Sequence, residues 1–177
     1  GLTVGADGRP RCWWGASAPE YIDYHDREWG VPLHGDDALF ERLCLEAFQS
    51  GLSWLTILRK RPAFRRAFDD FRIERVAEFD DADVQRLLSD ATIVRNRAKI
   101  AASIQNARAA LALDVGLDEL LWSFAPTEPR ARPAGIGDIV AVTTESKAMA
   151  KELKRRGFSF VGPTTAHALM QATGMVD

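Results

Sequence analysis

Apolar residues recur at intervals of three and four positions through most of the chain, and short polar or Pro/Gly breaks separate the runs. This spacing places apolar side chains on one face of an α-helix, whereas a half-buried β-strand requires apolar and polar residues to alternate. No segment shows a convincing alternation of that kind. We therefore expect an all-α fold, in which helices bury their apolar faces against one another.

Local signals predict where the first two helices begin and end. Ser17, with Glu20 three positions later, has the form of a capping box, so a helix is expected to begin there. Gly30 is expected to end this helix. Asp36 or Asp37 is expected to cap the second helix, which a glycine at position 51 stops.

The third helix is expected to begin at Ser53, whose hydroxyl is placed to cap it, and Pro62 is expected to break it. The remaining helical patterns cover about residues 80–88, 94–113, 117–124, 144–156 and 163–173. The pattern at 94–113 is the longest of them.

Length and composition favour a single domain over residues 1–177. A chain of 177 residues with 46% hydrophobic residues can bury one substantial core, or at most two small lobes that share a long helix. Residues 1–10 are interpreted as a flexible N-terminal extension. The Pro/Gly-rich stretch at 126–138 is interpreted as a connecting loop and not as a domain boundary.

Charge and cysteine content restrict the compartment and the partners. No run of about eighteen apolar residues exists for a membrane span, and residues 1–12 lack the plan of a signal peptide, so we expect a cytoplasmic protein. The two cysteines cannot form a disulfide framework.

The net charge of −2 means that nucleic-acid binding would need local basic patches. Three segments are either such patches or solvated helix faces: residues 59–66, 95–99 and 151–156.

Aromatic residues are concentrated near the N-terminus. Four of the five tryptophans, Trp13, Trp14, Trp29 and Trp54, lie in the first third of the chain, beside glycines and polar residues. The segment "YIDYHDREWG" adds two tyrosines and a histidine within ten residues. Such rings either pack a core or form a recognition site on loops and helix ends held by a rigid scaffold.

Glu46 lies at the edge of the apolar face of its expected helix, one turn after Leu43. It is either a boundary carboxylate that reaches water or an anion held among aromatic rings. In the second case it would serve as a hydrogen-bond acceptor in a poorly solvated pocket, suited to a flat, positively charged ligand.

Several segments together resemble one enzyme family. They are "RCWW", "YIDYHDREWGVP", "LFERLCLEAFQSGLSWLTILRKR", "ATIVRNRAKIAASIQNARA", "WSF", "SKAMAKELKRRGFSFVGPTT" and "MQATGMVD". In order and spacing they are similar to the DNA-3-methyladenine glycosylase I family of the helix-hairpin-helix DNA glycosylase superfamily, from about Arg11 to the last residue. The resemblance implies a two-lobed all-α fold with the base pocket between the lobes, in a bacterial enzyme that removes 3-methyladenine from alkylated DNA.

The resemblance also implies the site residues. The base pocket would be formed by Trp14, Tyr24, Trp29 and Trp54, with Glu46 as the candidate catalytic residue, chiefly in base recognition. A base must leave the stack to reach such a pocket. The implied partner is double-stranded DNA with alkylated bases, the product is free 3-methyladenine, and the chemistry requires no cofactor. A monomer is expected.

By the same resemblance, residues 92–99 match the family's hairpin, where Arg95, Arg97 and Lys99 would contact phosphates without reading sequence. The turn at residues 50–53 carries Leu52 at its tip. Leu52 is either the wedge that fills the gap left by the flipped base or a small hydrophobic staple.

Zinc is the point at which the chain departs from the family. The family usually binds a structural zinc through a Cys and a His matched here by Cys12 and His25, and through a His and a Cys beyond the last helix, which have no match in this sequence. Two ligands do not close a tetrahedral structural site. Zinc binding is therefore left open, and His167 is interpreted as a packed or surface histidine.

Two other functions remain open on the sequence alone. One is a non-catalytic all-α DNA-binding or adaptor module whose rings only pack a core. The other is a glycosylase for another cationic N3-alkyl purine. The first would bind duplex DNA without releasing a base, and the second would release a different base.

Overall fold

The computed structural model describes residues 1–128, 137 and 139–176. Within these residues the chain is mostly helical, and its one small sheet is an antiparallel pair of β1 (Leu2–Val4) and β2 (Pro10–Cys12). The Pro/Gly-rich loop expected at 126–138 lies mostly outside the described residues. No helix among those described is long and apolar enough to cross a membrane.

The described residues contain helices of five to fifteen residues. They are α1 (Pro19–Arg27), α2 (Asp36–Gln49), α3 (Trp54–Ala67), α4 (Ile73–Ala77), α5 (Asp81–Ser89), α6 (Arg97–Leu111), α7 (Leu117–Trp122), α8 (Thr144–Arg155) and α9 (Pro163–Ala172). Two 3-10 turns, η1 (Trp13–Ala16) and η2 (Asp69–Phe71), precede α1 and α4. The sequence pattern did not predict α4, η1 or η2, which are too short to show a helical period.

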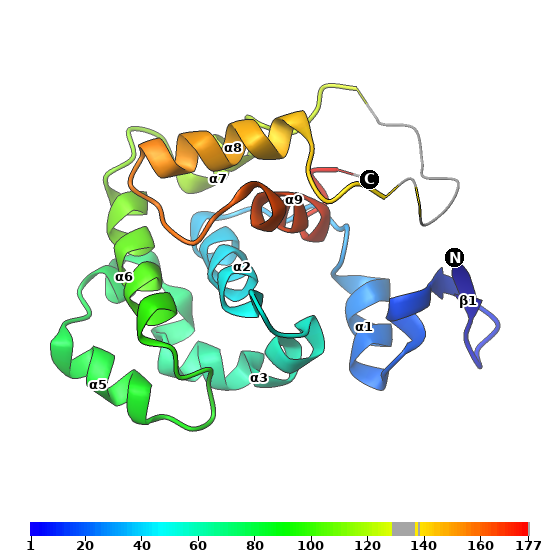
Figure 1. Cartoon of the computed structure of the whole chain (residues 1–177), viewed down its shortest axis with the longest axis horizontal. Coiled ribbons are helices and arrows are strands. Elements are labelled where there is room, and N and C mark those ends of the chain that lie inside the picture. The colour runs from blue at the N-terminus through cyan, green and yellow to red at the C-terminus, as the bar shows by residue number, and fades with distance from the viewer. Residues whose placement is uncertain (129–136, 138, 177) are drawn as a thin grey trace.

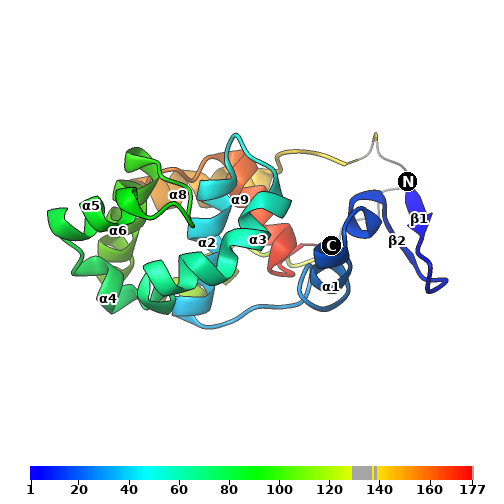
Figure 2. The same ribbon diagram turned by 90° about the horizontal axis from the view of Figure 1, so that it is seen from below.

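The elements lie in three groups along the long axis of the molecule (Figures 1 and 2). The hairpin, η1 and α1 are at one end, α2, α3 and α9 are in the middle, and α4, α5 and α6 are at the other end. Because α2 runs through the middle, its residues 42–48 are all buried. Its apolar side chains join phenylalanines from α3 and η2 in one continuous core.

The end of α9 holds the segment that follows α1. The backbone N–H groups of Gly30 and Leu33 donate to the carbonyl oxygens of Ala172 and Thr173, at 3.3 and 3.1 Å. Gly174, with φ of +71°, lies so close that a Cβ atom there would be 2.7 Å from the backbone nitrogen of Pro32. This close approach, which needs glycine, fixes α1 beside the C-terminal end of α9.

Two of the predicted helix starts are confirmed by their hydrogen bonds. Ser53 Oγ accepts from the Thr56 N–H at 3.2 Å and caps α3. Asp80 and Asp83 form a reciprocal capping box at α5. Both caps satisfy backbone donors that the first turn of a helix leaves free.

The predicted capping box at Ser17 is wrong, although α1 begins close to the expected place. The N-cap is Ala18 and makes no side-chain hydrogen bond. Ser17 Oγ instead donates to the Trp14 carbonyl oxygen at 2.6 Å and closes η1. Glu20 forms an ion pair with Arg59 of α3 at 2.8 Å, so tertiary contacts occupy both side chains.

The predicted caps of α2 are also wrong. The N-cap is Gly35, and neither aspartate caps its own helix. Asp36 accepts from the Asp118 N–H at 2.8 Å, in the first turn of α7. Asp37 accepts from the Ile73 N–H at 2.9 Å, at the start of α4. The two carboxylates therefore cap helices that are distant in sequence, which a local pattern does not reveal.

The expected break at Pro62 does not occur, because α3 continues through it to Ala67. A proline inside a helix costs about 3 kcal/mol. Ile57 before the proline and Phe64 after it are both fully buried. Burial of side chains on both sides offsets the cost, since only a continuous helix places them in the same core.

The N-terminal hairpin was not predicted, because its strands do not alternate apolar and polar residues. Its anchor is Arg11, which is only 2% exposed. The guanidinium donates to Asp7 in the hairpin turn and to Asp26 in α1, each through two hydrogen bonds of 2.6 and 2.8 Å. A buried, doubly paired arginine ties the hairpin to α1.

Candidate active site

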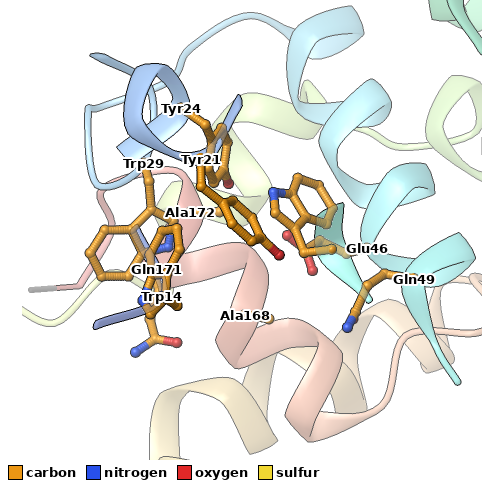
Figure 3. A pocket seen from close by; sticks show the side chains of 10 residues that line it. Trp14, Tyr21, Tyr24, Trp29, Glu46, Gln49, Ala168, Gln171 and Ala172 are labelled. Atoms are coloured by element: carbon orange, nitrogen blue, oxygen red, sulfur yellow. The ribbon is translucent and has the colours of Figure 1, made fainter. Parts of the chain in front are cut away.

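A cavity of about 240 Å³ lies between the N-terminal part of the chain and the central helices (Figure 3). Aromatic side chains from η1, α1, the turn after α1 and α3 line it together with Glu46 and Gln49 of α2. Helix α9 contributes Ala168, Gln171 and Ala172. Pockets for drug-sized ligands have volumes of about 300–1,000 Å³. The smaller cavity suits a ligand the size of a single base.

The structure brings together all four rings predicted for the pocket. Trp14 and Trp29 lie edge to face with ring centroids 5.3 Å apart, and Trp14 is 6.2 Å from Tyr24. Tyr24 is 5.6 Å from Trp54, which begins α3. Tyr21, one turn before Tyr24, also lines the cavity, although the sequence analysis did not place it there. The walls therefore offer flat surfaces from separate elements to a planar ligand.

Ion pairs to α3 position α1, which carries both tyrosines. Arg61 donates to the two carboxylate oxygens of Glu28 at 2.5 and 2.7 Å, a bidentate geometry. The pair of Glu20 and Arg59 lies at the opposite end of α1. Together with the contacts at the end of α9, these pairs hold the aromatic wall against α2 and α3.

Glu46 is the cavity's buried acid. Its side chain comes from the central helix and the residue is 6% exposed. Burial raises the pKa of Glu46 to about 7, and the nearby Arg42 cation limits that rise. Among the described residues, none donates a hydrogen bond to its carboxylate. At 6% exposure the Glu46 side chain has little contact with bulk solvent, and it lines the cavity.

Arg42 is a site residue that the sequence analysis missed. It lies one turn before Glu46 and is 7% exposed. Its Nη1 donates to the Tyr24 hydroxyl at 2.6 Å, and its Nη2 is 3.5 Å from Glu28. The guanidinium carbon is 5.3 Å from the Tyr24 ring centroid and 5.5 Å from that of Trp54. The sequence feature that could have identified Arg42 as a site residue is its position four residues before Glu46.

A cavity with aromatic walls and an unpaired buried carboxylate can bind a flat cation or a hydrogen-bond donor. The family comparison agrees with this chemistry. The family model described as methyladenine glycosylase matches residues 13–177. The chain belongs to the methyladenine glycosylase family.

Individual relatives cover nearly the whole chain. The DNA-3-methyladenine glycosylase 1 of Escherichia coli (strain K12) is 44% identical over 94% of this chain and 91% of its own length. The DNA-3-methyladenine glycosylase of Haemophilus influenzae is 40% identical over 94% and 92%. A crystal structure of 3-methyladenine DNA glycosylase I superposes with a TM-score of 0.90 at 45% identity, covering 94% of each chain.

A Staphylococcus aureus structure, described as the structural basis of 3-methyladenine recognition by 3-methyladenine DNA glycosylase I, has a TM-score of 0.89 at 36% identity and covers 94% of this chain and 91% of its own. The resemblance predicted from the sequence is thus confirmed, as are the all-α glycosylase fold and the enzymatic class. A non-catalytic binding module is excluded.

Two hydrogen bonds close the turn between α2 and α3, and Leu52 at its tip is 40% exposed. Gly51 has φ of +79°, a conformation that favours glycine. The Leu52 N–H donates to the Gln49 carbonyl oxygen at 2.7 Å, and Gln49 Nε2 donates back to the Leu52 carbonyl oxygen at 3.1 Å. Because Gln49 also lines the cavity, the turn is fixed directly beside the cavity mouth.

The connection between α5 and α6, with the first turn of α6, exposes two of the three side chains predicted to contact phosphates. Asn96 Oδ1 accepts from the Lys99 N–H at 3.1 Å and caps α6, which begins at Arg97 and not at position 94 as predicted. Arg95 and Arg97 are exposed and make no hydrogen bond or ion pair with another described residue. Their charges are available to an anionic partner.

Lys99 does not fit its predicted role as a phosphate contact. It is 8% exposed, and its Nζ donates to the carbonyl oxygens of Phe48 and Ser50 at 2.9 and 2.5 Å. The C-terminal end of a helix carries carbonyl groups without intrahelical partners, which a buried ammonium satisfies. Lys99 therefore ties the start of α6 to the turn that carries Leu52. It fixes the position of Arg95 and Arg97 relative to Leu52.

The residues matched to half of the family's zinc site lie together, but the described residues do not complete it. The Cys12 N–H donates to His25 Nε2 at 3.4 Å, and His25 Nδ1 lies 3.1 Å from Asp26. Among the described residues, no group of three or more His, Cys, Asp or Glu side chains is arranged to hold a metal ion. His167, on α9, is packed in the interior.

Proposed function

We propose that the cavity receives a 3-methyladenine base flipped out of alkylated duplex DNA, and that the chain hydrolyses the bond between this base and deoxyribose. The relatives' names and the recognition structure support this substrate. An enzyme that acts on a base has to take it out of the stack, and an aromatic cavity that opens to the surface provides the place to hold it.

The observation that carries the proposal is Glu46, a buried carboxylate with no hydrogen-bond donor among the described residues. Such an acceptor in the wall of a cavity favours a ligand that supplies a donor. The nucleoside of 3-methyladenine carries a positive charge and a 6-amino group, so it supplies both the charge and the donor. The rings around the cavity add cation–π attraction.

The charge on the base also explains how the reaction proceeds without a cofactor. When the C1′–N9 bond breaks, its electron pair returns to the purine and neutralises the positive charge, so the base leaves as a neutral molecule. Water adds to C1′ and its proton passes to solvent. Little general-acid catalysis is needed, so the enzyme's selectivity depends on which base the cavity holds.

The test is chromatography of the bases released when the chain is incubated with N-methylated duplex DNA. The proposal predicts that 3-methyladenine appears with time and enzyme concentration. Release of only a different N3-alkyl purine would show that the substrate is another adduct. Binding of the duplex with no released base would contradict the proposed reaction.

We also propose that Leu52 enters the duplex at the flipped base, while Arg95 and Arg97 contact phosphates on the same face. The supports are the exposure of the three side chains and the link through Lys99 between their two elements. Phosphate contacts of this kind fix the position of the protein on DNA and read no sequence.

Changing Arg97 to Ala should weaken binding to every duplex about equally and reduce the slope of log K against log salt by about one unit, because one phosphate contact releases about one counterion. The measurement is a fluorescence-anisotropy titration at several salt concentrations. Arg72→Ala is the matched control, since Arg72 pairs with Asp69 at 2.7 Å and Arg75 remains as a partner for that carboxylate. An unchanged slope in Arg97→Ala would show that the connection between α5 and α6 does not contact DNA.

We propose that the 177-residue chain holds its N-terminal region without zinc. The hairpin is tied to α1 by Arg11, Asp7 and Asp26, and two candidate ligands do not close a structural zinc site. We therefore expect well under one equivalent of zinc in the purified protein, and a melting temperature that a chelator barely changes. Stoichiometric zinc, together with a melting temperature that depends on Cys12, would contradict this prediction.

A further inference from the structure

Arg42 occupies an unusual place for a cation, behind the wall of a pocket proposed to bind a cationic base. It is buried, one turn before Glu46 on α2, and its guanidinium lies near the rings of both Tyr24 and Trp54. Burying an arginine is costly unless it is paired and hydrogen-bonded. The inference about its role rests on the proposed function of the cavity.

The hydrogen bond between Arg42 and Tyr24 has only one possible direction. A guanidinium donates and cannot accept, so the Tyr24 hydroxyl oxygen is the acceptor in the 2.6 Å bond with Arg42 Nη1. The hydroxyl keeps its own hydrogen for a different acceptor. Burial raises the pKa of Tyr24, so that hydrogen is retained near neutral pH. Tyr24 is therefore a donor toward the cavity that it lines.

The groups around Glu46 from α1 and its C-cap are two tyrosines and one acid. Tyr21 and Tyr24 line the cavity with it. Burial raises the pKa of both tyrosines, so both are neutral near pH 7. Glu28 is farther back, where the bidentate contact with Arg61 of α3 lowers its pKa.

Within the part of the chain that the structure describes, one cation acts on Glu46. Arg42 precedes Glu46 by one turn on α2 and opposes the effect of burial on the Glu46 pKa. Arg61 is engaged by Glu28. The cavity residues of α9 are alanine and glutamine, which do not titrate. Arg42 is thus the charge that favours an ionised Glu46.

We propose that Arg42 is a positioning residue: it fixes Tyr24 as a hydrogen-bond donor of the cavity and keeps Glu46 as an ionised acceptor. Adenine presents an acceptor, N7, beside a donor, the 6-amino group, whereas guanine presents the two acceptors N7 and O6. The Tyr24 donor and the anionic Glu46 acceptor match the first pattern, and the carboxylate repels the second. Arg42 would therefore set the base preference without touching the base.

The test replaces Arg42 with Met, which fills similar space without charge or donor, and measures single-turnover excision from methylated duplex between pH 5.5 and 9. The acid limb of the pH–rate profile is the range in which excision falls as Glu46 is protonated. It should move to higher pH by about one unit, because an opposite charge at close range shifts a carboxyl pKa by about that much. Excision at pH 7.5 should fall about three- to tenfold. The ratio of 3-methyladenine to 3-methylguanine released should also fall.

Three further variants separate positioning from packing. Arg42→Lys keeps the charge, so its acid limb should stay near that of the parental chain. Arg42→Gln removes the charge with a polar side chain and replaces the Met variant if that variant does not fold. Arg65→Met is the matched control, since Arg65 pairs with Glu41 and is half-exposed, so the acid limb should not move.

An acid limb that stays in place in both Arg42→Met and Arg42→Gln, with a lowered melting temperature, would show that Arg42 only packs the interior and would overturn the inference. This failure differs from failure of the proposed function. In the latter case the parental chain itself would release no 3-methyladenine at any pH.

Discussion

Glu46→Gln is expected to lower the excision of 3-methyladenine by about 10- to 100-fold. The amide keeps the size and one acceptor oxygen of the side chain but removes the negative charge. A cationic base then loses a charge-assisted hydrogen bond worth about 1.5–3 kcal/mol. Affinity for undamaged duplex should hardly change, since phosphates outside the cavity determine it. Single-turnover kinetics and an anisotropy titration measure the two quantities.

The same substitution should stabilise the fold at high pH, which distinguishes a lost function from a damaged structure. The folded-state pKa of Glu46, about 7, is above its ordinary value of 4.5. Folding therefore favours the neutral acid, and the stability that the neutral acid contributes is lost as pH rises through about 7. Glu46→Gln should gain up to about 3 kcal/mol in free energy of unfolding at pH 8, relative to the parental chain, and little at pH 4.

Glu41→Gln is the matched control. Glu41 lies on the same helix, away from the cavity, and pairs with Arg65 at 2.8 Å. Its excision rate should equal that of the parental chain. Parental excision by a folded Glu46→Gln variant would contradict the role given to the carboxylate.

Trp54→Ala should give the second large effect, a decrease in excision of about 5- to 150-fold, because a stacked base loses about 1–3 kcal/mol when its aromatic partner is removed. Trp54 also packs against the core, so the free energy of unfolding should fall as well. Thermal melts establish that the assay is run below the transition. Trp54→Phe keeps a ring in place and should recover part of the rate.

Trp13→Ala provides the control for this change. Trp13 is 59% exposed and does not line the cavity, although it is adjacent to Trp14. Its removal should leave excision within about twofold of the parental rate. Equal losses in Trp13→Ala and Trp54→Ala would show that the rates report general destabilisation and not stacking.

The helices could be predicted because their apolar period reflects burial on one face, but several caps could not. Ser53 caps its own helix, so a local pattern was sufficient there. Asp36 and Asp37 cap helices that follow much later in the sequence. The same local pattern fits either outcome, since tertiary contacts decide which backbone N–H a carboxylate meets.

The sequence was sufficient to predict the aromatic residues and the acid of the site. It was not sufficient to predict the buried positions of Arg42 and Lys99. Aromatic residues beside glycines, and an acid at the edge of an apolar face, stand out in a sequence. Arg42 and Lys99 resemble ordinary helix-surface cations, yet both are buried by partners from other elements. For Lys99 this reversed the expected role, because its ammonium faces backbone carbonyls inside the protein and not phosphates outside it.

The central claim is that Glu46 is a buried anionic acceptor for the base, and a carbon-13 NMR titration of its side-chain carboxyl tests this most directly. In the free protein the midpoint should lie near pH 7. Saturation with 3-methyladenine should move the midpoint well below that value, because a ligand that donates to the carboxylate favours the ionised form. A midpoint near 4.5 in the free protein, or one that the base does not move, would contradict the claim.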